Sequence, residues 1–223
     1  ETAADGAHTV MIDGPAGVAP AAETVPADPS GAAFWLVAAA IHPDAELRLE
    51  GVSTNPTRRA IIDILRRMGA SIEEIAIEGP GGPDGEPLAD LVVRSSELRG
   101  IDLSPAEVAG AIDEIPILAL AAAAASGTTH IRGASELRHK ESDRIATVVG
   151  GLHGLGAEIE ATDDGFVVHG GDGLHGGSLD AAAGAGRGNS PTRNGQKTEE
   201  MAIDAVRMLV AAGADLNARG ADN

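Results

Sequence analysis

Two stretches of the chain read alike and decide how it folds: IIDILRRMGASIE at residues 61–73, and VVGGLHGLGAEIE at residues 148–160, 87 positions further along. Each stretch places apolar residues at helical spacing, then a glycine, then a short run suited to a strand. A glycine just after the last periodic residue is typical of a helix C-terminus, where the backbone turns left-handed. Both stretches therefore predict a helix, a stop at Gly69 or Gly156, and a strand.

The similarity extends to the segments that precede each stretch. An alanine-rich apolar run, expected to be helical, is followed by a short Gly or Pro turn and a strand that ends in glycine; the two copies occupy residues 32–41 with 47–51, and 117–125 with 128–133. We expect Ser30 to cap the first of these helices rather than to act as a nucleophile.

After the second copy, Asp163, Asp164 and Gly165 form a turn signal that predicts an antiparallel hairpin between residues 157–160 and 166–169. The repeating unit is thus helix, strand, helix, strand, strand. One such unit cannot enclose its own apolar face, so tandem units are expected to pack against one another. The sequence predicts an α/β fold with short antiparallel sheets.

Charge and composition exclude several classes of protein. The chain has 16 Lys and Arg against 34 Asp and Glu, a formal net charge of -18, which argues against nucleic acid as a partner. It has no Cys, which excludes a disulfide scaffold, thiol catalysis and Cys-ligated metals. Its longest apolar run is about half of a bilayer span, and no signal-type segment precedes it. We expect a cytoplasmic protein with no membrane partner and, lacking paired His ligands, no metal.

One short segment concentrates positive charge in this acidic chain: Arg132, Arg138, Lys140 and Arg144 lie within thirteen residues. Lys140 and Arg144 would share one helical face if a helix begins before them. Cations at a helix N-terminus favour anions, and Glu141 between them is a natural proton carrier. The competing interpretation is a solvated helix start with surface ion pairs, which composition alone favours.

The segment ELRHKESDRI at residues 136–145 resembles the signature of the EPSP synthase (3-phosphoshikimate 1-carboxyvinyltransferase) family. Three more segments of the chain resemble segments of this family and occur in the expected order. They are VPADPSGAAF at residues 25–34, NPTR at 55–58 and IDEIPILA at 112–119. The resemblance covers about residues 7–175. It implies a partial enolpyruvyl-transferase fold, built from the repeated units as lobes of an inside-out α/β barrel.

The resemblance also implies a reaction and the residues that perform it. The enolpyruvyl group of phosphoenolpyruvate moves to the 5-hydroxyl of shikimate 3-phosphate and phosphate leaves, in the shikimate pathway, with no metal or organic cofactor. Asp113 is implied to orient and deprotonate the hydroxyl, and Glu141 to carry the proton at the methylene carbon. Lys140 is implied to contact the shikimate substrate and Arg144 to clamp phosphoenolpyruvate. These two anionic small molecules are the expected partners.

The resemblance suggests four parts in the chain. Residues 1–52 are expected to be the remnant of a first lobe, and residues 53–175 to hold the repeat units of a second lobe. Residues 176–199, rich in Gly, Ser and Asn, predict a flexible linker. Residues 200–223 resemble the second helix and turn of an ankyrin repeat, and half a repeat cannot form a domain alone.

Several elements of the family have no counterpart in the chain, so we expect it to be truncated at both ends. Three classes of function therefore remain open. The first is an active transferase whose site is completed by self-association or by a complementing chain. The second is a catalytically silent fragment, and the third an interaction scaffold that uses the ankyrin-like tail. Among enzymes, UDP-N-acetylglucosamine enolpyruvyl transferase is the alternative, but the missing Cys and the KESDR run favour the shikimate enzyme.

Overall fold

The computed structural model describes residues 25–77, 86–140, 142–171 and 174–175, together with Met11 and Gly14. Glu141, the expected linker at residues 176–199 and the ankyrin-like segment at residues 200–223 lie outside the described residues. Among the described helices, none combines the length and the hydropathy that crossing a membrane requires.

The predicted repeat of helix, strand, helix, strand, strand is confirmed. The first unit consists of α1 (Pro29–Ile41), β1 (Glu46–Ser53), α2 (Ala60–Arg67), β2 (Ser71–Ile77) and β3 (Leu88–Arg94). The second consists of α4 (Ile115–Ala124), β5 (Gly127–Ile131), α5 (Arg144–Gly154), β6 (Glu158–Thr162) and β7 (Gly165–Gly170). Between the units lie β4 (Asp102–Leu103) and α3 (Pro105–Gly110), and the 3₁₀-helix η2 (Ser135–His139) precedes α5.

The two units build sheets of the same topology. In the first sheet the last strand, β3, pairs antiparallel with both β1 and β2. In the second sheet the last strand, β7, pairs antiparallel with both β5 and β6, which includes the predicted hairpin. The exception to the expected antiparallel pairing is β4, which adds to β5 in parallel.

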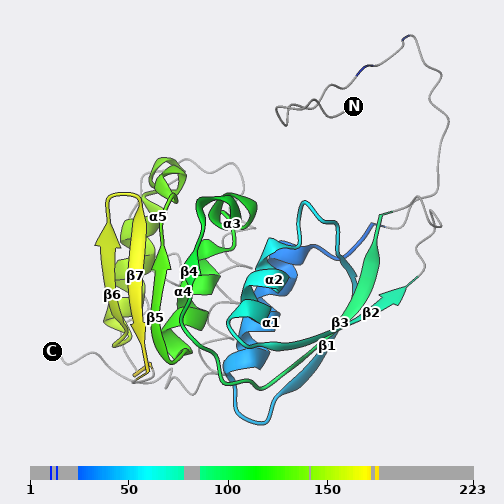
Figure 1. Cartoon of the computed structure of the whole chain (residues 1–223), viewed down its shortest axis with the longest axis horizontal. Coiled ribbons are helices and arrows are strands. Elements are labelled where there is room, and N and C mark those ends of the chain that lie inside the picture. The colour runs from blue at the N-terminus through cyan, green and yellow to red at the C-terminus, as the bar shows by residue number, and fades with distance from the viewer. Residues whose placement is uncertain are drawn as a thin grey trace, which may run out of the picture.

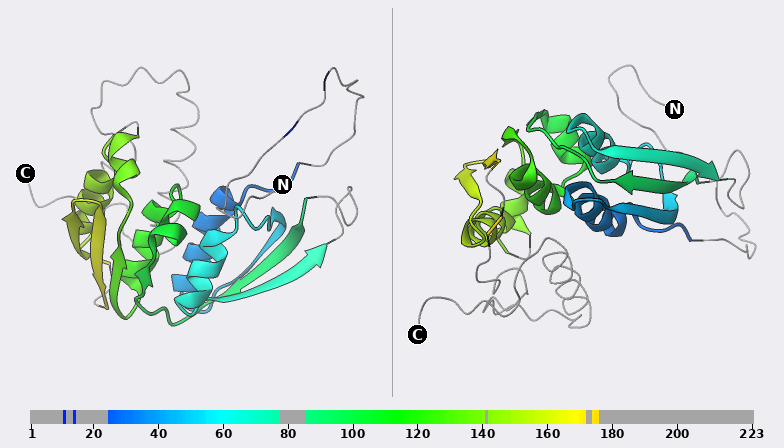
Figure 2. Two further views of the ribbon diagram at one scale, coloured as in Figure 1. Left: turned by 45° about the horizontal axis from the view of Figure 1, so that its top comes forward. Right: turned by 90° about the horizontal axis from the view of Figure 1, so that it is seen from below.

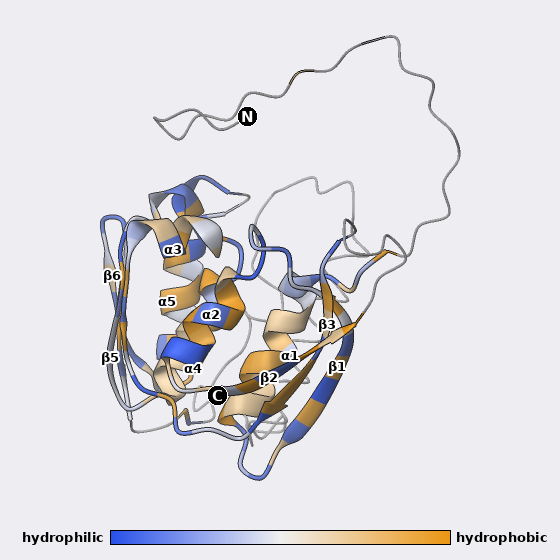
Figure 3. Cartoon of the chain, turned by 45° about the vertical axis from the view of Figure 1, so that its right-hand side comes forward, coloured by the Kyte–Doolittle hydropathy of each residue, from blue (hydrophilic) through white to orange (hydrophobic). Residues whose placement is uncertain are grey.

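The Ala-rich helices lie between the two sheets (Figures 1 and 2). Helix α1 packs on β1 and β3, helix α4 packs on β7, and α1 and α4 pack on each other. Small side chains make this close approach possible, since Ala33 and Ala40 of α1 and Ala119 and Ala122 of α4 are fully buried. Phe166 on β7 is the one fully buried aromatic side chain among the described residues. Coloured by hydropathy, α1 is largely apolar and polar residues alternate with apolar ones along β1 (Figure 3).

The two predicted glycine stops are equivalent in the structure. Gly69 has a φ of 103° and Gly156 a φ of 91°, and each follows the C-cap residue of its helix, Met68 of α2 and Leu155 of α5. Residues with a Cβ rarely adopt this left-handed backbone, so glycine is needed at both ends. The sequence repeat is therefore a repeat of backbone conformation.

Two local expectations are wrong. Ser30 does not cap α1: the cap is Asp28, whose carboxylate accepts from the amides of Ser30 and Gly31, with Pro29 as the first helical residue. Nor do Lys140 and Arg144 share a helical face, because Asp143 caps α5 and Lys140 lies before it, after η2.

The lobe boundary expected between residues 52 and 53 falls inside β1. The strand pairs with β3 on both sides of that point, through Leu49 with Leu91 and Ser53 with Leu88. The division into residues 1–52 and 53–175 stays a prediction.

Candidate active site

Asp113 lies in the turn that joins α3 to α4. The turn is closed by backbone hydrogen bonds from the amides of Glu114 and Ile115 to the carbonyl of Ala111, at 2.9 and 3.0 Å. The Asp113 side chain is 58% exposed, so its carboxylate projects from the start of α4 into solvent. A carboxylate in this position is accessible to a ligand without any rearrangement of the core.

Lys140 and Arg144 approach that carboxylate from a different part of the second unit. Lys140 Nζ lies 3.8 Å from Asp113 Oδ1, and Arg144 Nη1 lies 3.5 Å from the same oxygen. Both cations are mostly covered, with side-chain exposures of 26% and 29%. The structure thus brings together three of the four residues implied by the resemblance, and the fourth, Glu141, lies outside the described residues.

Lys140 is also held by Glu136, one turn earlier. Its Nζ lies 2.6 Å from Glu136 Oε1, and this hydrogen bond is the main reason that the pKa of the Lys140 ammonium is raised. Partial burial opposes the shift, whereas the charges of Glu136 and Asp113 add to it. The same hydrogen bond lowers the pKa of the Glu136 carboxyl. Lys140 therefore stays charged, as an anion-binding group must.

Arg138, another cation of the basic segment, has a structural role. Its guanidinium donates to the carbonyls of Asp163, at 2.9 Å, and Thr162, and it forms an ion pair of 2.7 Å with Asp143. These bonds fasten η2 and the cap of α5 to the turn between β6 and β7. They set the path of the chain that presents Lys140 and Arg144.

Two residues of this region were not predicted from the sequence. Glu136 could have been found from its spacing, because residues four apart on a helical turn are neighbours. Glu114 follows Asp113 and opens an apolar helix, where a 9% exposed carboxylate needs a partner. That partner is the hydroxyl of Ser30, which donates to Glu114 Oε1.

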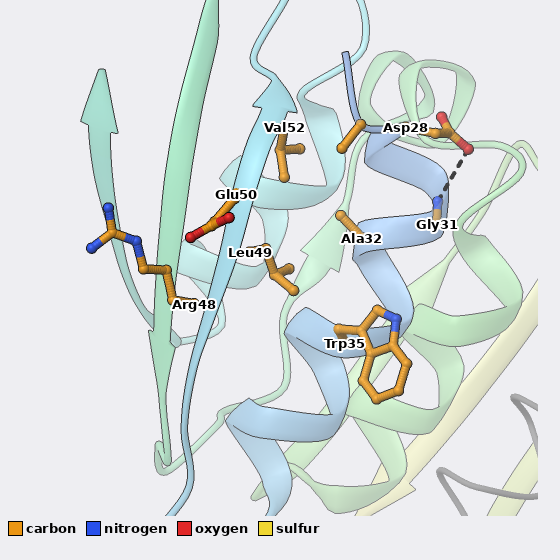
Figure 4. Close-up of a pocket in the computed structure, with 9 residues that line it drawn as sticks. Asp28, Gly31, Ala32, Trp35, Arg48, Leu49, Glu50 and Val52 are labelled. Carbon is orange, nitrogen blue, oxygen red and sulfur yellow. Dashed lines mark hydrogen bonds between the residues drawn. The ribbon is translucent and has the colours of Figure 1, made fainter. Parts of the chain in front are cut away.

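A hollow of about 530 Å³ lies elsewhere, between the start of α1 and β1 (Figure 4). Trp35, Leu49 and Val52 form its apolar part, and Arg48 and Glu50 belong to its rim. Its lining among the described residues does not include Asp113, Lys140 or Arg144. The charged cluster is therefore separate from this hollow. No group of three or more His, Asp or Glu residues suited to a metal ion occurs in the described part of the chain.

Residues 2–183 match the protein family described as EPSP synthase (3-phosphoshikimate 1-carboxyvinyltransferase). The chain is 58% identical over 158 residues to a 3-phosphoshikimate 1-carboxyvinyltransferase of Roseiflexus sp. (strain RS-1), covering 70% of this chain and 35% of that protein. It is 56% identical over 150 residues to the enzyme of the same name from Leuconostoc citreum (strain KM20), covering 67% and 34%.

The structure agrees with these matches. An EPSP synthase from Acinetobacter baumannii superposes with a TM-score of 0.65 at 41% identity, covering 70% of this chain and 36% of that one. A further structure of EPSP synthase from the same organism gives 0.66 at 34% identity, covering 83% and 40%. The chain spans about a third of the length of the curated relatives that it matches. With most of its length matched in sequence and the same fold, this chain belongs to the EPSP synthase family.

Proposed function

We propose that this chain carries part of a site that transfers the enolpyruvyl group of phosphoenolpyruvate to the 5-hydroxyl of shikimate 3-phosphate. The observation that carries the proposal is one oxygen, Asp113 Oδ1, which has Lys140 Nζ and Arg144 Nη1 within 4 Å. The carboxylate comes from the start of α4, and the cations come from the segment around the start of α5. A base beside two cations is the arrangement that the attack of a hydroxyl on an anionic substrate requires.

Asp113 is the base in this proposal. As the hydroxyl oxygen bonds to carbon 2 of phosphoenolpyruvate, Asp113 takes its proton. Its exposure leaves it open to the substrate, and Lys140 and Arg144 lie beside it to hold the anionic parts of the substrates.

Arg144 and Lys140 hold the anions. The planar guanidinium of Arg144 suits a carboxylate or phosphate of phosphoenolpyruvate, which it can grip through two parallel hydrogen bonds. Lys140 acts as a point charge toward the shikimate substrate, and Glu136 keeps that charge in place at 2.6 Å. Two mostly covered cations are screened by salt less than fully exposed ones.

Glu141 completes the proposed chemistry. It follows Lys140 in the chain and is proposed to deliver a proton to the methylene carbon as the tetrahedral intermediate forms. It then removes a proton from the resulting methyl group as phosphate leaves, which restores the double bond. One residue can perform both steps because the second reverses the proton movement of the first.

The test is a phosphate-release assay on the purified chain with both substrates, alongside chemical-shift mapping with each substrate alone. We expect shifts around residues 136–145 and Asp113, and loss of any turnover in Asp113→Ala. The matched control is Asp63→Ala, which removes an aspartate of similar exposure, 55%, that is also paired with an arginine, Arg59.

A catalytically silent chain that binds these anions is the second candidate, because the chain spans about a third of its relatives' length. Binding without phosphate release would favour it. Shifts that avoid Asp113, Lys140 and Arg144 would contradict both candidates, as would turnover that Asp113→Ala leaves unchanged.

A further inference from the structure

Glu114 is a buried carboxyl group for which the proposed reaction has no use. Its side chain accepts a hydrogen bond from the hydroxyl of Ser30, on α1 of the other repeat unit. The residue is 9% exposed, whereas the Asp113 side chain, one position earlier, is 58% exposed. Two neighbouring acids thus differ in their surroundings: Asp113 is open to solvent, and Glu114 is buried in the contact between the units.

The contact continues beyond Ser30. Arg58 Nη2 donates to the same hydroxyl oxygen at 3.2 Å and lies 3.5 Å from Asp28 Oδ1. Asp28 in turn caps α1 through the amides of Ser30 and Gly31, both at 3.2 Å. A continuous polar chain therefore runs from Glu114 through Ser30 and Arg58 to Asp28.

This chain joins three segments that are far apart in the sequence: residues 25–34, 55–58 and 112–119. These are segments that carry the family resemblance, yet the residues alone indicated no interaction between them. In the structure they meet where α1 of the first unit and α4 of the second begin. Their meeting point adjoins the turn that carries Asp113.

Physical chemistry explains why Glu114 holds its place. A buried carboxylate is costly unless hydrogen bonds and positive charge compensate for lost water. Ser30 supplies the hydrogen bond, Arg58 adds charge behind it, and the N-terminus of α1 contributes its positive partial charge. The Glu114 backbone is held too, because its amide donates to Ala111 and its carbonyl accepts from Leu118.

Asp113 has weaker support of its own. Its carboxylate lies 3.5 and 3.8 Å from Arg144 and Lys140, distances of loose ion pairs rather than short hydrogen bonds. The placement of its backbone therefore depends on the turn, which backbone hydrogen bonds to Ala111 close and which the Glu114 side chain joins to α1.

We propose that Glu114 is a positioning residue, which fastens the Asp113 turn to α1 of the neighbouring repeat unit through Ser30. The proposal rests on the proposed function, because positioning has a consequence only if Asp113 takes a proton from substrate. Proton transfer needs the base within hydrogen-bond reach of the hydroxyl, and small misplacements weaken it strongly. The first repeat unit thereby takes part in a site whose groups all lie on the second.

The test compares four variants of the whole chain: Glu114→Ala, Ser30→Ala, the double variant that combines them, and Glu114→Gln. Glu114→Ala and Ser30→Ala remove the two halves of the hydrogen bond, and Glu114→Gln keeps an oxygen that accepts from Ser30. Ser96→Ala is the matched control, since the Ser96 hydroxyl bridges Ser71 and Arg94 within the first sheet. Each is measured by ¹⁵N relaxation at the amides of Ile112 and Asp113, by the Asp113 carboxyl ¹³C shift, and by titration with shikimate 3-phosphate.

We expect Glu114→Ala and Ser30→Ala to lower the Asp113 order parameter from about 0.85 toward 0.6. Both should move its carboxyl shift and weaken shikimate 3-phosphate binding several-fold, with non-additive effects in the double variant. Glu114→Gln should give the order parameter, carboxyl shift and affinity of the chain without substitutions. Ser96→Ala should lower the melting temperature without moving the Asp113 signals.

Unchanged Asp113 signals in Glu114→Ala and Ser30→Ala, whatever their stability, would overturn the proposal. So would Glu114→Gln behaving like Glu114→Ala. Failure of the proposed function has a different signature: the unchanged chain would not bind shikimate 3-phosphate, while the Asp113 signals would still respond to Glu114→Ala and support the tether.

Discussion

Asp113 and Arg144 are 31 positions apart in the chain, and their side chains meet with Asp113 Oδ1 3.5 Å from Arg144 Nη1. The contact spans the beginnings of α4 and α5, two helices that pack on each other. Lys140 reaches the same oxygen from the loop before α5, at 3.8 Å. In a chain with a net charge of -18, this pair of cations is a local exception to the overall field.

The first prediction concerns anion binding at this cluster. Arg144→Ala should weaken the binding of phosphoenolpyruvate and Lys140→Ala that of shikimate 3-phosphate, both of which we expect in the millimolar range, roughly -4 kcal/mol. Raising the salt concentration should weaken both further, because Lys140 and Arg144 keep 26% and 29% of their side chains exposed, and charges in contact with solvent are screened within about 8 Å at physiological ionic strength. Titration calorimetry measures both effects. Arg94→Ala is the control, since Arg94 pairs with Glu46 and Glu73 on the first sheet and should not change the affinity.

The second prediction concerns the charge state of Lys140. Removing the carboxylate in Glu136→Gln should lower the Lys140 pKa toward its ordinary value, because the hydrogen bond to Glu136 is the largest cause of the upward shift. A titration followed by NMR at the Lys140 side chain measures the change. Glu160→Gln, at an exposed position on β6, should leave that pKa where it is. A Lys140 pKa that does not respond to Glu136→Gln would mean that Asp113 alone holds the ammonium.

The third prediction concerns a half-buried ion network on the first unit. Glu74 lies 2.8 Å from Arg59 and also pairs with Arg66. Glu74→Ala should lower the free energy of unfolding by about 1–3 kcal/mol, the value of hydrogen bonds to charged groups. Glu73→Ala, on the same strand but 56% exposed, should cost less than about 1 kcal/mol. Denaturant unfolding separates the two, and equal losses would contradict the assignment.

The fourth prediction follows from the same carboxyl group and concerns pH. Burial would raise the Glu74 pKa, but the hydrogen bonds from Arg59 and Arg66 outweigh it and leave the pKa below 4.5. The folded state therefore binds the Glu74 proton less readily than the unfolded state does. Its contribution is present above about pH 4.5 and is lost as the pH falls through the folded pKa. Glu74→Gln should reduce the slope of stability against pH in that acid range, and an unchanged slope would show that other carboxyl groups carry it.

The fifth prediction uses two glycines of the second unit. Gly156→Ala should destabilise the fold by about 1–2 kcal/mol, because its φ of 91° is left-handed and a Cβ there would also crowd His175. Gly151→Ala should stabilise it by about 0.4–1 kcal/mol, since Gly151 lies inside α5 with open space around it. Thermal unfolding of both variants gives the comparison, and two shifts of the same sign would contradict the equivalence of Gly156 with a helix stop.

Local rules explain where the sequence prediction went wrong at Ser30 and Lys140. Asp28 followed by Pro29 is a stronger helix start than Ser30, because Asp caps well and Pro is favoured at the first helical position. In the same way Asp143 caps α5 by accepting from the amide of Ala146, which excludes Lys140 from the helix. In both cases the helix begins at the residue that best satisfies its free amides.

The repeat, the order of its helices and strands, and the glycine stops at Gly69 and Gly156 could all be predicted from local sequence patterns. These features depend on apolar spacing and on backbone conformation, which are properties of neighbouring residues. The meeting of Lys140 and Arg144 at Asp113, and the hydrogen bond between Glu114 and Ser30, could not be predicted in this way and follow from the packing of the helices. Those contacts depend on how α4 packs on α5 and on α1. The packing in turn depends on side chains that are far apart in the chain, and no local pattern specifies the distances between them.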